Sequence, residues 1–118
     1  MIYVCIPAHN EERTIGVLLW KIRKVMGEFG RDYEVLVFDD ASTDGTATVL
    51  DRYRGVLPLR VLKEEHRAGY PVAVQRLLRE ALNRTSYPKR DAAVLLQADF
   101  TESPDYIVPL LKALEGGA

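Results

Sequence analysis

The sequence predicts an α/β fold in three layers, with helices covering both faces of a mostly parallel sheet. Two observations predict it. Short apolar segments of strand length alternate along the whole chain with segments whose apolar residues recur at helical spacing. Each strand-like segment is apolar throughout rather than at every second residue, which is typical of parallel strands buried on both faces.

Four strands and four helices are expected in strict alternation. The predicted strands are residues 2–6, 34–38, 59–62 and 92–96. The predicted helices are residues 15–29, a short helix that ends near residue 53, residues 71–84, and a last helix that begins at 103–104 and runs to 114. No internal repeat, low-complexity segment or linker interrupts the pattern, so residues 1–118 are expected to form one domain.

Residues with strong local preferences mark several boundaries. Pro7 is expected to stop the first strand, Asn10 to cap the first helix, and Gly30 to end that helix. Ser103 and Pro104 suit the N-cap and first helical positions of the last helix. The chain stops just after this helix, where an α/β protein normally continues into another strand, so we expect a truncated domain.

Composition excludes several classes of protein. The chain has 118 residues, of which 47% are hydrophobic and 28% charged, with a net charge of −1. Basic residues are scattered among acids, so no nucleic-acid-binding surface is expected. The single cysteine, Cys5, lies in an apolar run and is interpreted as a buried thiol. Neither a signal peptide nor an apolar run of membrane-spanning length is present in the sequence, so cytoplasmic localisation is the default expectation.

Polar residues gather where the predicted strands end, at the edge where parallel α/β sheets bind ligands. Three exits carry most of them, namely residues 7–12, 39–45 and 97–99, and the fourth leads into 64–70. The acid pair Asp39 and Asp40 is either a solvated turn or a group that accepts hydrogen bonds from a nucleoside. Its position at the ligand edge favours the second interpretation.

Any phosphate site in this chain needs something other than a glycine-rich loop. The sequence has no GxGxxG after the first strand and no GxxxxGK[ST], which argues against dinucleotide enzymes and P-loop NTPases. A divalent cation held by one or two carboxylates, phosphate oxygens and water is the alternative. Asp99 ends the fourth strand and suits that role, although it also suits a cap of the turn before Ser103.

Four segments carry a resemblance to a known family. They are IPAHNEERTI, VLVFDDASTDGT, RAGYP and LLQADFTESPDYI, which together span nearly the whole chain. In this order and spacing they resemble family 2 glycosyltransferases of the GT-A fold, nearest to polyprenyl-phosphate sugar synthases of the dolichol-phosphate mannose synthase type. The resemblance implies a Rossmann-like, nucleotide-diphospho-sugar transferase fold. It also implies that this is the N-terminal, nucleotide-binding part, with the catalytic base and the acceptor site in a missing second half.

The resemblance implies a role for each matching residue at the first two strand exits. Pro7, Ala8 and Glu11 resemble the loop that packs around the nucleoside. Asp40 resembles the acid that hydrogen-bonds the base or the ribose. Asp39 is then expected to support the same loop.

At the other two exits the resemblance is less regular. Arg67 and Gly69 match a loop written Asn-x-Gly-Tyr-Gly in relatives, with Arg67 in place of Asn and Pro71 in place of the last Gly. Gln97 and Asp99 match a DxD-type signature whose last acid binds Mg²⁺ or Mn²⁺. Gln97 is a neutral amide where relatives have Asp, so a nucleotide contact or an outer hydrogen bond to the metal site is expected of it.

The implied reaction transfers a sugar from a nucleoside-diphosphate sugar to an acceptor hydroxyl or phosphate, with inversion favoured. The acceptor would be a polyprenyl phosphate or a saccharide, with a divalent metal on the diphosphate. Two alternatives stay open. One is a nucleotide-sugar-binding fragment without turnover, and the other is a phosphoreceiver signalling domain. The order of the acids counts against the second, because its acid pair would follow the first strand.

The helix at residues 15–29 allows two interpretations of its charged surface. Lys21, Arg23 and Lys24 form either a solvated face, which is favoured, or a peripheral contact with anionic lipid at the cytoplasmic face of a membrane. Trp20 on the same helix is expected to pack against the protein. Elsewhere, Asp44 is expected to cap the second helix, and His9 to be an ordinary loop residue.

Overall fold

The computed structural model describes residues 1–85 and 92–96. The strands are β1 (Ile2–Ala8), β2 (Tyr33–Asp40), β3 (Leu59–Glu64) and β4 (Ala92–Leu95). The helices are α1 (Ile15–Phe29), α2 (Thr46–Tyr53) and α3 (Tyr70–Arg84). The elements predicted within this part of the chain are therefore present, in the predicted order. The expected last helix, Gln97 and Asp99 lie outside the described residues.

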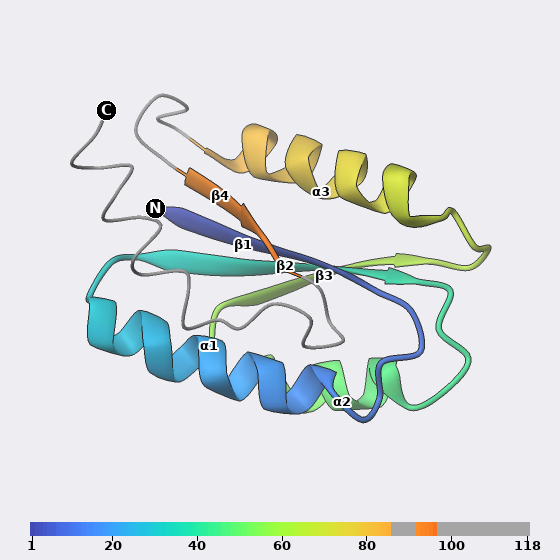
Figure 1. Ribbon diagram of the computed structural model, residues 1–118, viewed down its shortest axis with the longest axis horizontal. Helices are drawn as coiled ribbons and strands as arrows, with labels where there is room; N and C mark the ends of the chain where they lie inside the picture. The colour runs from blue at the N-terminus through green and yellow to red at the C-terminus, as the bar shows by residue number, and fades with distance from the viewer. Residues whose placement is uncertain (86–91, 97–118) are drawn as a thin grey trace.

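The strands form a parallel sheet in the order β3-β2-β1-β4. Helices α1 and α2 cover one face and α3 covers the other, so the predicted three-layer α/β arrangement is confirmed (Figure 1). The chain proceeds from β1 to β2 to β3 on one side, and β4 then joins the other side of β1. The order reverses between β1 and β4, and open α/β sheets bind ligands beyond the strand ends at such a reversal.

The strands are apolar throughout because each face of the sheet packs against its own hydrophobic core. Alternate residues of β2 point to opposite faces, so Val35 and Val37 pack towards α1 and α2 while Leu36 and Phe38 pack towards α3. All four side chains are fully buried. Cys5 lies in the α3-side core, which confirms the buried thiol expected from the sequence. Burial raises the pKa of this thiol to about 11, so it is unreactive at neutral pH.

Of two boundaries that the sequence marked, one differs from the expectation and one agrees with it. Pro7 does not stop β1, which continues to Ala8. Only Ile2 to Cys5 of β1 pair with β4, so the missing N–H of Pro7 interrupts no described pairing on that side. Gly30 ends α1 as predicted, with φ at 78° and its N–H donating to the carbonyl of Met26 at 3.1 Å.

Trp20 does not pack as expected, because helical geometry places it off the buried stripe of α1. The buried residues of this helix are Ile15, Leu18, Leu19, Ile22 and Met26. Trp20 points away from them and is 53% exposed, with the Arg23 guanidinium 5.2 Å from the centre of its ring. Within residues 1–85 and 92–96, no helix is both long enough and apolar enough to cross a membrane.

Candidate functional site

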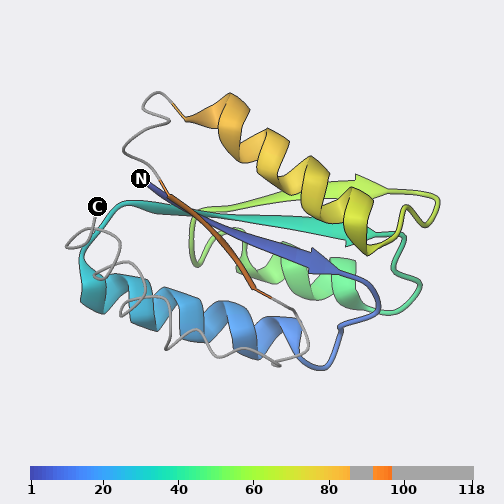
Figure 2. The same cartoon turned by 45° about the horizontal axis from the view of Figure 1, so that its top comes forward.

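The carboxyl ends of β1, β2 and β3 lie at the same edge of the sheet, where their arrowheads point in Figure 2. β2 runs two residues further than predicted, so Asp39 and Asp40 belong to the strand and pair with Lys63 and Glu64 of β3. Their exposed fractions are only 0% and 3%. The acid pair is therefore not a solvated turn. Because consecutive strand residues point to opposite faces, Asp39 faces the α1–α2 side and Asp40 the α3 side.

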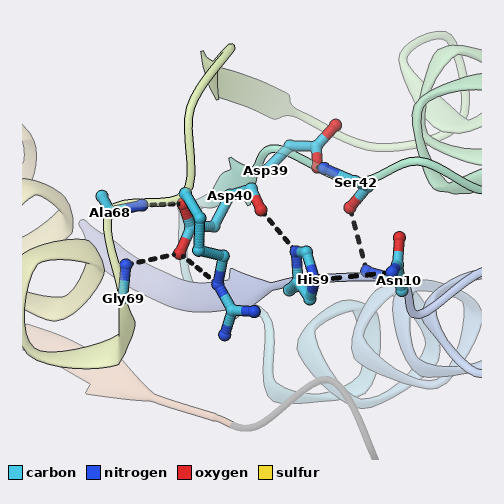
Figure 3. Close-up of polar contacts among 8 residues, drawn as sticks. His9, Asn10, Asp39, Asp40, Ser42, Ala68 and Gly69 are labelled. Atoms are coloured by element: carbon cyan, nitrogen blue, oxygen red, sulfur yellow. Dashed lines mark hydrogen bonds and ion pairs between the residues drawn. The ribbon is translucent and has the colours of Figure 1, made fainter.

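Asp40 fastens the loop between β3 and α3 to the end of β2. Its Oδ1 accepts the N–H of Ala68 at 2.6 Å and its Oδ2 accepts the N–H of Gly69 at 2.8 Å (Figure 3). Arg67 Nε–H also donates to Oδ2, at 3.1 Å. Burial raises the pKa of Asp40, but the two backbone N–H groups and Arg67 outweigh it, so the pKa lies below its ordinary value. Asp40 is thus an ionised, nearly buried carboxylate at the ligand edge.

Gly69 has a backbone conformation that suits no other residue. Its φ and ψ are 91° and 160°, a region populated almost only by glycine. This conformation directs its N–H to Asp40 immediately before the first turn of α3. Arg67 and Gly69, both singled out from the sequence, therefore meet Asp40 directly.

His9 joins the same centre from the loop after β1, where the sequence suggested an ordinary loop residue without such a contact. Its Nδ1 lies 2.5 Å from the carbonyl oxygen of Asp40 (Figure 3). Because a carbonyl oxygen only accepts hydrogen bonds, Nδ1 carries the proton in this contact. A single histidine after a strand offers no spacing that would have revealed this contact in advance.

Asn10 ties the loop after β1 to the loop after β2 and does not cap α1. Its Oδ1 accepts the N–H groups of Thr43 and Asp44 at 2.8 and 3.3 Å, and its own N–H donates to the Ser42 hydroxyl at 3.0 Å. The N-cap of α1 is Thr14, four residues later. Asn10 has a φ of 52°, in the left-handed region that asparagine tolerates well. The prediction was wrong because local preference could not show that the amide had partners in another loop.

Asp44 stabilises the start of α2, as expected, from one position before the N-cap residue Gly45. Its Oδ1 accepts the N–H of Thr46 at 3.0 Å, and its Oδ2 accepts the N–H of Glu12 at 3.3 Å. Burial raises the pKa of Asp44, but hydrogen bonds from Thr46 and Glu12 outweigh it and lower the pKa overall. Asp44 therefore connects the loops after β1 and β2 at a second point.

The lowered pKa values of Asp40 and Asp44 predict a loss of stability in acid. A carboxyl with a lower pKa in the folded state stabilises the protein above its unfolded value, about 3.9, and this contribution disappears as the pH falls through the folded value. We expect the free energy of unfolding, measured in urea at several pH values, to fall steeply below about pH 4. Asp40→Asn and Asp44→Asn should each make that fall shallower. An unchanged profile in both variants would contradict the assignment.

Asp39 supports the loop after its own strand, β2, whereas the resemblance implied that it supports the loop after the first strand. Its Oδ1 accepts the N–H of Ser42 at 3.3 Å. Its Oδ2 is buried without a hydrogen-bond partner among the described atoms. Ala41, which lies between Asp39 and Ser42, has a φ of 56°, a conformation that costs an alanine about 1–2 kcal/mol. The turn that follows the acid pair is therefore held in a strained conformation.

The remaining predicted residues divide between this edge and the start of α1. Pro7 and Ala8 end β1, with Ala8 paired to Asp39 and buried. Glu11 contacts helix residues instead: its N–H donates to Thr46 Oγ1 at 2.9 Å, and its carboxylate accepts the Thr14 hydroxyl at 3.1 Å. These contacts belong to the starts of α2 and α1, and the nucleoside-facing role of Glu11 stays a prediction.

A metal centre is not formed by the described residues alone. Across residues 1–85 and 92–96, no group of three or more His, Cys, Asp or Glu side chains could hold an ion. The predicted metal ligand, Asp99, and its neighbour Gln97 lie beyond this part of the chain. β4 does lead towards the ligand edge, since it runs parallel to β1 and the Leu96 N–H donates to the Cys5 carbonyl at 2.9 Å.

Comparison with known proteins decides the family. A sequence model described as "Glycosyl transferase family 2" matches residues 3–118. The chain belongs to glycosyl transferase family 2. This match confirms the resemblance seen in the four sequence segments, and it leaves no support for the phosphoreceiver alternative.

Relatives of this family 2 chain include a dolichol-phosphate mannosyltransferase from Pyrococcus furiosus. It is 29% identical over 115 residues, which are 98% of this chain and 30% of that protein. Mannosyltransferase PcManGT from Pyrobaculum calidifontis, solved in complex with GDP-Man and Mn²⁺, is 27% identical with a TM-score of 0.67. That alignment covers 96% of this chain and 32% of PcManGT.

A third comparison supports the GT-A fold alone. Staphylococcus aureus TarS, solved in complex with UDP-GlcNAc, is 23% identical with a TM-score of 0.72, over 98% of this chain and 31% of TarS. This family 2 chain thus spans about a third of the length of the relatives it matches. The expected fold is confirmed over nearly the whole of this chain. In each relative, the matching region is only part of a longer protein.

Proposed function

We propose that this chain forms the nucleoside-diphosphate-sugar site of a glycosyltransferase that moves a sugar to an acceptor hydroxyl or phosphate. The observation that carries the proposal is Asp40. It is an ionised carboxylate, buried at the ligand edge of a family 2 chain, and the loops after β1 and β3 both bond to this residue. A nucleoside offers N–H and O–H donors, which such a carboxylate accepts.

In this proposal the strand ends hold and orient the nucleotide. Asp40 accepts a hydrogen bond from the base or ribose, and Pro7 and Ala8 form the wall contributed by β1. Arg67 and Gly69 complete the opposite side, because both are already bonded to Asp40. The loops after β1 and β2 are tied together by Asn10, which supports a site whose walls need little rearrangement when the nucleotide binds.

The diphosphate is proposed to bind through Mg²⁺ or Mn²⁺, with Asp99 as the protein ligand and Gln97 beside it. The described residues supply no metal cluster of their own, so the site depends on Asp99 together with diphosphate oxygens and water. PcManGT, solved with Mn²⁺, supports a divalent ion of this kind. When bound, the ion would neutralise charge on the departing diphosphate.

Binding of nucleoside diphosphates tests this proposal directly. We expect UDP or GDP to bind more tightly with Mn²⁺ than with EDTA, as measured by titration calorimetry. Asp99→Ala should abolish the metal dependence and leave the weaker, metal-free binding. Asp51→Ala is a matched control, because Asp51 is an acid on α2 whose side chain is 69% exposed. Failure of both nucleotides to bind in a metal-dependent way would overturn the ligand assignment.

In this proposal, sugar transfer requires a longer chain that also contains the second half found in relatives. Residues 1–118 alone then bind the nucleotide sugar without turnover. Sugar transfer by residues 1–118 should be absent and should appear in a longer version of the chain. Radiolabelled transfer to a polyprenyl phosphate or to a saccharide distinguishes the two acceptor classes. Turnover by residues 1–118 alone would contradict the division into two halves.

A peripheral membrane contact through α1, on the cytoplasmic side, is proposed for a lipid-linked acceptor. Val17 and Trp20 are both 53% exposed, and Arg23 and Lys24 are exposed on the same helix. Apolar side chains including Trp, flanked by basic residues, suit anionic lipid headgroups. The sequence alone favoured a purely solvated face, but Val17 and Trp20 add exposed apolar side chains to the basic residues of this helix.

Trp20 itself reports on that contact, since it is the only tryptophan in the sequence. Its fluorescence should shift to the blue with phosphatidylglycerol-containing vesicles and stay unchanged with phosphatidylcholine alone. Lys24→Glu should abolish the shift, whereas Arg79→Glu, an exposed arginine on the opposite helix layer, should preserve it. Equal shifts with both kinds of vesicle would refute the charge-dependent contact.

A further inference from the structure

Asp40 has room for one more hydrogen bond. A carboxylate has about four acceptor positions, two on each oxygen. Oδ2 already accepts Gly69 N–H and Arg67 Nε–H, and Oδ1 accepts Ala68 N–H. One position is left, on Oδ1. The loop between β3 and α3 therefore determines how many donors a ligand can bring to this carboxylate.

Arg67 places donors beside that remaining acceptor. Of the three described groups bound to the Asp40 carboxylate, Arg67 is the only side chain. The Arg67 side chain is 56% exposed, whereas the Asp40 side chain is 4% exposed. A ligand that approaches Asp40 therefore meets the guanidinium. Only its Nε–H is engaged among the described contacts, so its Nη groups can donate to a ligand oxygen. The site thus presents one acceptor next to a cluster of donors.

We infer that Arg67 makes this site selective for a base whose single ring N–H lies between two carbonyls, and hence for uridine over guanosine diphosphate sugars. This inference rests on the proposed function. Uracil offers N3–H to Oδ1 and a flanking carbonyl to Arg67. Guanine offers two adjacent donors, N1–H and N2–H, which pair with a carboxylate only when both oxygens are available. Oδ2 is already saturated, so one guanine donor is left without a partner.

The relatives do not decide this question, because TarS was solved with UDP-GlcNAc and PcManGT with GDP-Man. Arg67 is also a feature of this chain in particular, since the sequence resemblance leads one to expect Asn at its position. Asn lacks the charged guanidinium group of arginine, whose several N–H donors could both occupy Oδ2 and reach a base carbonyl. The selectivity is therefore assigned to this residue, and a substitution at this position tests it.

The test compares UDP and GDP binding, with Mn²⁺, to the unmodified chain and to Arg67→Ala. We expect UDP to bind on the order of 10-fold more tightly or better. In Arg67→Ala, UDP loses a donor while Oδ2 regains an acceptor position for guanine, so UDP should weaken, GDP should not, and the ratio should approach one. Arg76→Ala, which removes an exposed α3 arginine paired with Glu64, should leave the ratio unchanged.

Three outcomes would contradict the inferred selectivity for uridine. Equal or tighter GDP binding by the unmodified chain would overturn the inference while leaving the proposed function in place. An equal loss of both nucleotides in Arg67→Ala would show that Arg67 only supports the loop. If neither nucleotide binds the unmodified chain, the proposed function fails, and this inference fails with it.

Discussion

Asp40→Asn is expected to lower the free energy of unfolding by about 2–4 kcal/mol and to weaken nucleoside diphosphate binding whether or not metal is present. The amide would place an NH₂ group against the N–H donors that Asp40 now accepts from Arg67, Ala68 and Gly69. At least one buried donor would lose its partner, and the loop before α3 would lose its attachment to β2. Urea unfolding and calorimetry with UDP in EDTA measure the two effects separately.

Asp39→Asn is the matched control, because it makes the same chemical change one residue earlier. Asp39 faces the other side of the sheet. Among the described atoms its carboxylate accepts only the Ser42 N–H, and its other oxygen has no partner. Its variant should retain most of the stability and nearly all of the metal-free affinity. If Asp39→Asn were as damaging as Asp40→Asn, or if Asp40→Asn affected only metal-dependent binding, the division of roles between the two acids would be wrong.

Gly69→Ala is expected to cost about 1–3 kcal/mol of stability, because alanine does not tolerate the backbone angles of this residue. No steric clash with a neighbour is needed to explain the loss, since a Cβ would come no nearer than 4.0 Å to Pro71. Relaxation of the strain would rotate the N–H away from Asp40 and loosen the loop that carries Arg67. Nucleotide affinity should therefore fall together with the midpoint of urea unfolding.

Gly27→Ala makes the same substitution at a position with the opposite expectation. Gly27 lies in the regular part of α1, and nothing would lie within 4 Å of an added Cβ. Alanine should stabilise the helix there by up to about 1 kcal/mol, without changing nucleotide affinity. A loss of stability in Gly27→Ala, or none in Gly69→Ala, would contradict the conformational explanation.

The fold was predictable because each layer follows a local pattern. Continuous apolar segments indicated strands buried on both faces, and the helical spacing of Ile15, Leu18, Leu19 and Ile22 indicated the buried stripe of α1. The same pattern misled for Trp20, which is apolar but lies between the buried positions of the helix. Residue type predicted burial there, whereas the angular position on the helix determined it.

The candidate site was predictable only in its location. The strand exits identified Asp39 and Asp40, but hydrophobicity ended β2 at Phe38, because nothing local to these acids suggests that they are buried. The donors that make burial of Asp40 tolerable come from the Arg67–Gly69 loop, far along the chain. The contact of His9 with Asp40 and the bonds of Asn10 to the next loop are likewise tertiary, and no spacing rule predicts them.

The strand order also bears on how the protein folds. β1, β2 and β3 pair with their neighbours in sequence, so each step closes a single crossover. β4 pairs with β1 at the opposite end of the sequence, with Ala92 beside Ile2, and contacts between distant segments form slowly because a long loop must first be closed. We therefore expect the pairing of β1 with β4, where the order reverses, to be completed last. Acquisition of nucleotide affinity during refolding should follow the appearance of helical structure, which makes the ligand a probe of the final folding step.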